Sequence, residues 1–232
     1  LTPKSFEFCH NLEEVAILLN HLVEIPENLF QNSPKLRFAN FDLNEIEVID
    51  ESAFSGTENS LQVASFVTNA ISTLPFGLFD GFNVIQRILF GTNRLTKLDS
   101  RIFGSSLSRV EHLAFHSNLI DGIDELIIDE STNLQTLMLS SNLCTNLNFG
   151  NVNGTRDFVR QQLQVCFENF QETYMECLYI SQPAFESYSC LMTIYNPLGR
   201  ELMVIDGEHL SGFTDADVTE VMIINQETGN IP

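Results

Sequence analysis

Apolar and polar positions alternate along residues 1–147 in a frame that repeats every 24 or 25 residues. Each copy places apolar residues at fixed distances from one asparagine, in the form L-x-x-L-x-L-x-x-N-x-L-x-x-L. The first copy has Leu12, Val15 and Ile17 before its asparagine. A fixed period of this length indicates a solenoid of stacked repeats. The asparagines that mark the six copies are Asn20, Asn44, Asn69, Asn93, Asn118 and Asn142.

The L-x-L part of each copy predicts a short strand, because alternate side chains of a strand face the same side and can enter a core. Stacked copies would form a parallel sheet, since a single repeat cannot bury its own apolar edge. The asparagine follows the strand, where its amide can pair with turn backbone groups that would otherwise be buried without partners. We therefore predict a curved α/β repeat solenoid with a concave parallel sheet, an irregular convex side and structural asparagines.

A second periodic row consists of phenylalanines on the predicted convex side. The chain has 19 phenylalanines and no tryptophan. An aromatic row at the repeat period predicts a spine that fills the volume behind the sheet. An aromatic cage for a ligand is the less favoured interpretation. The row consists of Phe30, Phe54, Phe79 and Phe103.

The repeats at 1–147 are followed by segments of a different kind. Residues 148–172 predict a loop and then a helix, which we interpret as a carboxy-terminal cap. Residues 173–217 contain two predicted strands joined by the turn at 196–199, and we interpret them as an amino-terminal type of β cap. Residues 218–232 fit part of another repeat.

This order of segments is unusual, because the amino-terminal type of cap follows the carboxy-terminal one. We expect either an excerpt from a protein with tandem cassettes or a permuted chain. In a permuted chain, the tail would fold back onto the first repeat or dock on the first repeat of another copy. Docking between copies would give a head-to-tail homo-oligomer that stays open unless a rotation closes it.

The five cysteines lack the C-x-x-C spacing of zinc and redox sites. A bridge between Cys144 and Cys166 would seal the end of the solenoid, where terminal repeats need a cap. Cys177 and Cys190 are candidates for a second local bridge. Cys9 is left over, and we expect it to be a small buried residue.

The sequon Asn153-Gly154-Thr155 lies in a segment rich in glycine and asparagine, where a glycan would fit. Together with the two expected bridges, Asn153 as a glycosylation site favours an oxidising environment. We therefore predict a secreted or extracellular protein.

The charge narrows the class of partner. The 31 acidic residues outnumber the 11 basic ones, for a formal net charge of −20. Nucleic acids and anionic membranes bind clustered Lys and Arg, so neither is an expected partner. No apolar run approaches the roughly 18 residues of a membrane span, and no signal peptide is evident, so we expect an excerpt or a mature fragment. Protein ligands are the expected partners.

Catalytic and metal-binding motifs do not emerge from the sequence. It has no G-x-S-x-G, no P-loop and no metal-ligand cluster, and its acidic groups lack the spacing of an EF-hand. We predict no enzymatic activity, no cofactor and no metal site.

Two stretches make the chain similar to secreted insect leucine-rich-repeat proteins. Residues 188–197 together with 205–213 resemble the amino-terminal cap of such proteins, and residues 160–167 resemble their closing cap. The repeats themselves are similar to those of Toll-like receptor ectodomains and cell-adhesion proteins. The resemblance implies extracellular recognition with immune or adhesive roles, and it implies no catalytic residues.

The variable positions of the predicted strands face the concave surface. This surface is poor in charge and rich in apolar side chains although the protein is acidic, which is typical of a protein interface. The alternative interpretation is that small residues only keep the inner sheet smooth. His112 and His116 would be about 13 Å apart, too far to share a metal, so we interpret them as ordinary surface histidines. The candidate partner-binding residues are Leu18, Phe38, Asn40, Asp42, Val67, Arg87, Leu89, His112, His116 and Met138.

These observations predict an extracellular module that recognises a protein through its concave face, with insect innate immunity as one setting. The alternative is a structural or adhesive protein that self-assembles through its caps.

Overall fold

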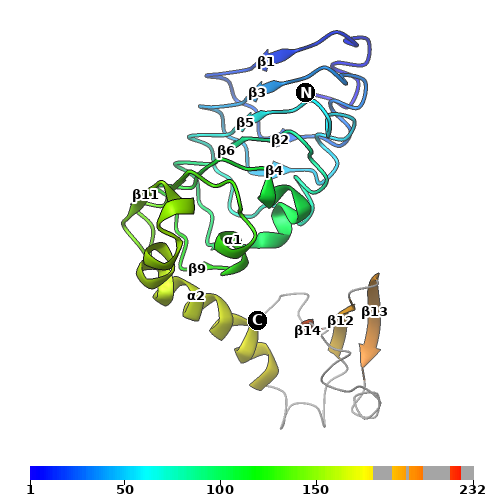
Figure 1. Cartoon of the computed structure of the whole chain (residues 1–232). Helices are drawn as coiled ribbons and strands as arrows, with labels where there is room; N and C mark the ends of the chain where they lie inside the picture. The colour runs from blue at the N-terminus through cyan, green and yellow to red at the C-terminus, as the bar shows by residue number, and fades with distance from the viewer. Residues whose placement is uncertain (180–189, 197–198, 206–219, 226–232) are drawn as a thin grey trace. The chain divides into compact units, whose positions relative to one another are not determined.

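The chain comprises two compact units, Leu1–Phe170 and Gln171–Pro232. The computed structural model describes residues 1–179, 190–196, 199–205 and 220–225 (Figure 1). The first unit contains all the repeats and the beginning of the cap helix. The second contains the rest of that helix and a small sheet.

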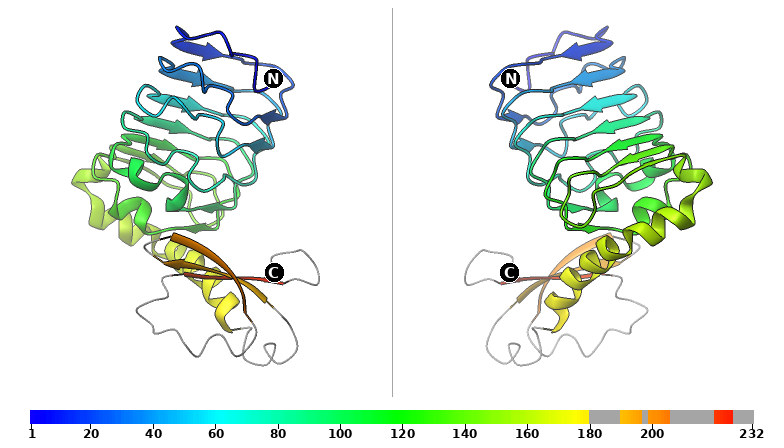
Figure 2. Two further views of the ribbon diagram at one scale, coloured as in Figure 1. Left: turned by 90° about the vertical axis from the view of Figure 1, so that its right-hand side faces the viewer. Right: turned by 90° about the vertical axis from the view of Figure 1, so that its left-hand side faces the viewer.

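The first unit is a solenoid in which each repeat contributes one short strand at the L-x-L positions (Figure 2). The six strands of the repeats lie parallel, in chain order. The predicted repeat solenoid is thus confirmed. A seventh strand, β11 (Asn148–Gly150), pairs antiparallel with the last of them. The six parallel strands are β1 (Glu14–Ala16), β3 (Phe38–Asn40), β5 (Val63–Ser65), β6 (Arg87–Leu89), β8 (His112–Ala114) and β10 (Thr136–Met138).

The opposite side of the solenoid is built from short and varied elements. The strand pair β2 (Glu24–Ile25) and β4 (Val48–Ile49) covers the early repeats, and β7 (Lys97–Leu98) pairs with β9 (Gly122–Ile123) in the later ones. Turns and short helices make up the rest of this side, so the irregular side predicted from the sequence is present. These helices are η1 (Ser100–Ile102), η2 (Gly104–Ser108) and α1 (Leu126–Asp129).

Phenylalanines form two stacked columns inside the solenoid. Successive rings of the predicted spine have centroids 5.6, 6.0 and 6.4 Å apart, and these rings are buried, so the spine is confirmed. The second column stacks at 5.4, 5.0 and 5.7 Å directly behind the sheet. Tilted and edge-on contacts join the two columns, so the aromatic core is continuous from repeat to repeat. The second column consists of Phe41, Phe66, Phe90 and Phe115.

The repeated asparagines tie each repeat to the one before it. Asn93 Nδ2 donates to the carbonyl oxygens of Phe66 at 2.8 Å and Phe90 at 3.1 Å. Its Oδ1 accepts from the backbone N–H of Ile71 at 3.0 Å. The asparagines at 44, 69, 118 and 142 make the same pair of links. These bonds satisfy backbone groups that have no partner within the turn, as the sequence predicts.

The residue before each of these asparagines has a left-handed backbone conformation. Its φ lies between 55° and 61°, and none of the six residues is a glycine. This conformation costs each residue of the order of 1 kcal/mol, so the surrounding repeat must hold it in place. The sequence gives no signal for it, because no glycine marks the position. The six residues are Leu19, Leu43, Thr68, Thr92, Ser117 and Ser141.

The last repeat departs from the frame where the cap begins. We expect Leu147 to be a core residue, but its side chain is 41% exposed, so this part of the frame is wrong. The chain instead turns back after Asn142, whose backbone N–H donates to the carbonyl of Thr145, and enters the antiparallel strand β11 where we expect a loop. The helices η3 (Val152–Gly154) and α2 (Arg156–Tyr179) follow.

A disulfide joins the last repeat to the cap helix. Cys144 and Cys166 are bridged, with their Cα atoms 5.2 Å apart, as predicted. Cys9 is free and only partly buried, whereas we expect it to be buried. The predicted Cys177–Cys190 bridge lies outside the side chains that the structure describes.

In the second unit, β12 (Cys190–Asn196) lies between β13 (Gly199–Ile205) and β14 (Glu220–Asn225). The pairing of β12 with β13 is antiparallel, so the predicted hairpin is present. Strand β14 also pairs antiparallel with β12, whereas the strands of the repeats pair in parallel. The segment boundaries at 172 and 217, and the partial repeat at 218–232, remain predictions.

Candidate functional site

The exposed face of the seven-stranded sheet, called the sheet face below, is organised in rows across the strands. The first residue of each strand is in register with the first residue of the next, and the third residues align in the same way. The first row is Glu14, Phe38, Val63, Arg87, His112 and Thr136. The second row is Ala16, Asn40, Ser65, Leu89, Ala114 and Met138.

The candidate binding residues from the sequence all reach the surface. Leu18 is 41% exposed and Met138 is 39% exposed, Arg87 is exposed, and the others are half-buried. Their neighbours Ser65, Gly91 and Ala114, which the strand pattern also predicts at the surface, are instead buried. At Gly91 the cause is a side chain of the next repeat, which the strand pattern alone does not show.

Gly91 is covered by the side chain of His116. A Cβ atom placed on Gly91 would lie 2.4 Å from Nε2 of His116, so the imidazole of His116 occupies the space above the glycine. A larger residue at this position would therefore force the His116 side chain to shift, whereas the backbone of Gly91 itself does not call for glycine. His116 Nδ1 lies 3.4 Å from Ser117 Oγ.

Asp42 and Asn40 support the sheet with their side chains. Asp42 Oδ1 accepts from Ser65 Oγ and from the backbone N–H of Val67, both at 2.7 Å. Asn40 Oδ1 accepts from the backbone N–H of Asp42 at 2.8 Å. Both residues lie on the sheet face as predicted, but these oxygens already have partners in the next repeat or the next turn. A partner-binding role for them remains a prediction.

His112 is likewise held by its neighbours. Its Nδ1 lies 2.8 Å from Thr136 Oγ1 of the next strand, and its Nε2 lies 4.0 Å from an oxygen of Glu111. Glu111 also accepts from Gln135 Nε2 at 3.3 Å. These contacts direct the imidazole toward β10, away from Arg87 on β6.

Arg87 has neither an ion pair nor a side-chain hydrogen bond among the described residues. Most other cations of the first unit have partners: Arg37 pairs with Glu13 at 2.6 Å, and Lys97 pairs with Asp121 at 3.0 Å. Arg101 Nη2 lies 2.6 Å from Asp99 Oδ2. Arg87 is therefore a guanidinium on the sheet face that the protein leaves available.

Two shallow depressions lie beside the sheet, along the residues that precede the strands. One has a volume of about 490 Å³ and is lined by Arg37, Asn59 and others. The second has a volume of about 300 Å³ and is lined by Arg109 and Asn133 among others. Gln62 and Val84 line both, so the two form one polar border of the sheet. Sequence reasoning misses this border, because no motif marks it.

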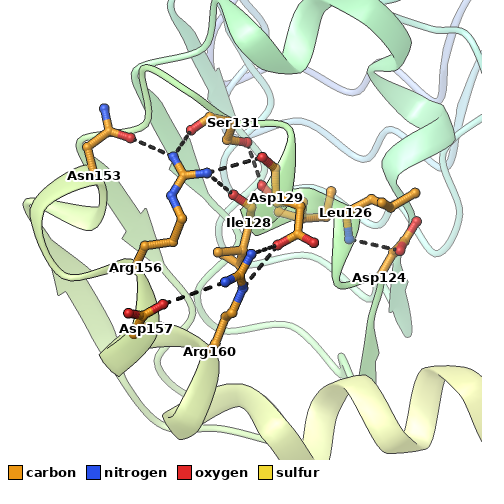
Figure 3. A network of polar contacts seen from close by, with 10 residues as sticks. Asp124, Leu126, Ile128, Asp129, Ser131, Asn153, Arg156, Asp157 and Arg160 are labelled. Carbon is orange, nitrogen blue, oxygen red and sulfur yellow. Dashed lines mark hydrogen bonds and ion pairs between the residues drawn. The ribbon is translucent and has the colours of Figure 1, made fainter.

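The cap is fixed to the last repeats by a polar network (Figure 3). The guanidinium of Arg156 donates to the carbonyl oxygens of Ile128, Asp129 and Ser131, where α1 ends. Arg160 forms an ion pair with Asp129. The hydrogen bond and charge of Asp129 raise the pKa of Arg160 above its usual value. The network therefore neutralises and satisfies the carboxyl end of α1.

The predicted glycosylation site also takes part in this network. Asn153 is exposed, and its Oδ1 accepts from Arg156 at 2.8 Å. A glycan would be attached through Nδ2, which none of these contacts uses. Glycosylation of Asn153 remains a prediction.

The described residues contain neither a candidate metal site nor a candidate membrane span. No three His, Cys, Asp or Glu side chains there lie together in a way that could hold a metal ion. Among the same residues, no helix combines the length and the apolar character needed to cross a bilayer.

Sequence comparison identifies the repeat family. Six copies of the BspA type leucine rich repeat region match residues 1–62 and 58–155. The chain belongs to this leucine-rich-repeat family. Such repeats typically form interaction scaffolds with extended binding surfaces and not enzymes. No curated protein matches this leucine-rich-repeat protein.

Two solved structures are similar to part of the chain. The leucine-rich repeat domain of APL1B is 17% identical, with a TM-score of 0.48 over 61% of this chain and 53% of that chain. A chain from the Toll–Spatzle complex, described as a hub in Drosophila development and innate immunity, is 18% identical. Its TM-score is 0.37, over 61% of this chain and 25% of that chain. The leucine-rich-repeat protein thus spans about half and a quarter of the lengths of these chains.

Proposed function

We propose that this leucine-rich-repeat protein is an extracellular recognition module that binds a protein partner through the sheet face. The observation that carries the proposal is the apolar character of this face in a chain with a net charge of −20. Phe38, Val63, Val67, Leu89 and Met138 are all partly or largely exposed there. An exposed apolar patch with polar neighbours is typical of a protein interface.

Two features support the extracellular setting. The Cys144–Cys166 bridge is of a kind that persists in oxidising environments. The sequon at Asn153 lies on the surface of the cap, where a glycan would meet solvent. We also propose a role in insect innate immunity, on the basis of the sequence resemblance alone.

Matched charge substitutions test the proposal. Leu89→Glu places a carboxylate on the sheet face, and Val48→Glu places one at an exposed strand position on the opposite side, where Val48 is 59% exposed. Affinity capture from extracellular fluid of the source tissue should recover the same partner with the wild-type chain and with Val48→Glu, and lose it with Leu89→Glu. Titration calorimetry with the purified partner then measures the loss. Equal affinity of Leu89→Glu and wild type would refute the sheet face as the binding surface.

The first repeat favours a second candidate function, self-assembly through the ends. The side chains of Leu12, Ile17 and Leu22 are only partly buried, while those at the same positions of the second repeat are fully buried. Phe8 nearby is 84% exposed. A further rung from another copy would cover this apolar end. Light scattering tests this candidate, because a chain that stays monomeric at high concentration would refute it.

A further inference from the structure

We propose that Arg87 is the charged anchor of the sheet face and that it binds a carboxylate of the partner. The carboxylate belongs to an extended acidic segment that also places an apolar side chain on Leu89. This inference rests on the proposed function and adds the chemistry of the partner to it.

The guanidinium of Arg87 is available to a partner. It is exposed and makes no side-chain contact that would occupy its donors among the described residues, although the chain has 31 acidic residues against 11 basic ones. The acid of the first row, Glu14, lies three strands away from Arg87. Two acids that flank strands β3 and β8 are engaged elsewhere: Asp42 with Ser65 and Val67, and Glu111 with Gln135. The protein thus leaves a guanidinium without a carboxylate at the centre of the sheet.

Arg87 also lies beside apolar side chains on the sheet face. It lies between Val63 and His112 in the first row, and Leu89 lies two residues further along the same strand. Leu89 is in register with Ser65 and Ala114, whose side chains are smaller, so the Leu89 side chain projects further from the sheet than these two neighbours. Arginine beside apolar groups is enriched at the energetic centres of protein interfaces, because the planar guanidinium binds a carboxylate through two parallel hydrogen bonds.

The distances over which the charges act indicate whether the group bound by Arg87 can be acidic. The net charge of −20 repels an acidic partner, but screening at physiological ionic strength limits this repulsion to about 8 Å. A carboxylate bound to the guanidinium is within about 3 Å of it, so the local attraction exceeds the distant repulsion at contact. A single guanidinium on the sheet face cannot hold a nucleic acid, which needs several phosphate contacts. An acidic protein segment is therefore the occupant.

The dimensions of the row set the length of that segment. From Phe38 to His112 the first row crosses three strand spacings, or about 14 Å. An extended chain covers this distance with about four or five residues. A segment of this length can therefore place its acid on Arg87 and an apolar residue on Leu89, two residues along the same strand.

A displayed library of random linear hexapeptides, selected against the full-length chain, tests the inference. The expected peptides contain Asp or Glu together with a large apolar residue. The affinity of a selected synthetic peptide should fall about 30- to 100-fold with Arg87→Gln. Arg94→Gln is the matched control, since Arg94 is exposed in the same repeat but outside the sheet face, and its effect should stay within about twofold. The thermal unfolding of both variants should match the wild type.

A charge exchange gives a second readout that a structural role of Arg87 would not produce. Arg87→Glu should lose the acidic peptide and bind a version in which lysine replaces the acid.

The outcomes separate the inference from the proposed function. Peptides that lose affinity with Leu89→Glu but carry no acid, or bind Arg87→Gln as tightly as the wild type, would overturn the role of Arg87 and leave the sheet face as the binding surface. Failure to enrich any peptide, or enrichment of peptides insensitive to both Leu89→Glu and Phe38→Asp, would contradict the inference and count against the proposed function as well.

Discussion

The two sides of the same strands differ in how strictly they repeat. Behind the sheet, four successive repeats carry the same residue, at Phe41, Phe66, Phe90 and Phe115, and the rings stack. In front of it, the same four strands begin with Phe38, Val63, Arg87 and His112, which differ in size and charge. The stacking of repeats therefore dictates the rear positions and leaves the front positions free. Residues that the fold does not dictate are the ones available for recognition.

We expect the largest loss of stability from a substitution in the ladder of repeated asparagines. Asn93→Ala would leave the buried N–H of Ile71 without its side-chain acceptor. It would also remove one of the two asparagine amides that donate to each of the carbonyls of Phe66 and Phe90. We expect the free energy of unfolding to fall by about 3–5 kcal/mol. Urea denaturation followed by circular dichroism measures it. A loss below about 1 kcal/mol would show that the ladder does not hold the repeats together.

The cap bridge has the next largest expected effect. Replacing both Cys144 and Cys166 with serine removes a cross-link between residues 22 apart, and we expect a loss of about 2–4 kcal/mol in the free energy of unfolding. The same denaturation experiment measures it. Because the bridge lies in the cap, binding to the sheet face below the unfolding temperature should be unchanged. Loss of binding in the still-folded variant would contradict the separation of the two regions.

Gly91→Ala tests a contact between neighbouring repeats on the front of the sheet. The added methyl group would meet the imidazole of His116, at a cost of about 1–2 kcal/mol. His116→Ala should remove the cost, so the double variant should be more stable than Gly91→Ala alone. Thermal denaturation of the three variants measures this coupling. Additive effects would mean that His116 does not cover the glycine in solution.

The smallest expected effect is at the first asparagine of the ladder. Asn20 is exposed, and its Nδ2 donates to the carbonyl of Leu18 at 2.7 Å. Asn20→Ala should cost less than about 1 kcal/mol in the same urea experiment, because water can replace this bond. If the free energy of unfolding fell as much as in Asn93→Ala, the stabilising effect of these asparagines would not depend on their hydrogen bonds to the preceding repeat.

Much of the fold could be predicted because residues that recur at the repeat period occupy equivalent environments in successive repeats. The strands, the asparagine links, the phenylalanine spine and the Cys144–Cys166 bridge all follow from spacing. Strand β11 and the exposure of Leu147 could not be predicted, because the period ends there and a local turn decides the path.

The sheet face was predictable only in outline. Strand alternation places its residues on one side, but it does not show that His116 covers Gly91 or that Asp42 is bonded to the next repeat. These contacts depend on pairs of side chains from neighbouring repeats, which one strand pattern does not contain. The availability of Arg87 likewise emerges only when the partners of the other cations are known.

The most direct test of the account is to measure stability and partner binding together in Leu89→Glu and Val48→Glu. We expect Val48→Glu to unfold within about 0.5 kcal/mol of the wild type because Val48 is exposed, and Leu89→Glu to lose about 1 kcal/mol because Leu89 is half-buried, so that both stay folded. We expect only Leu89→Glu to lose the partner in calorimetry. Equal binding by the two variants, or loss of binding by Val48→Glu alone, would contradict the claim that the non-repeating front of the sheet is the recognition surface.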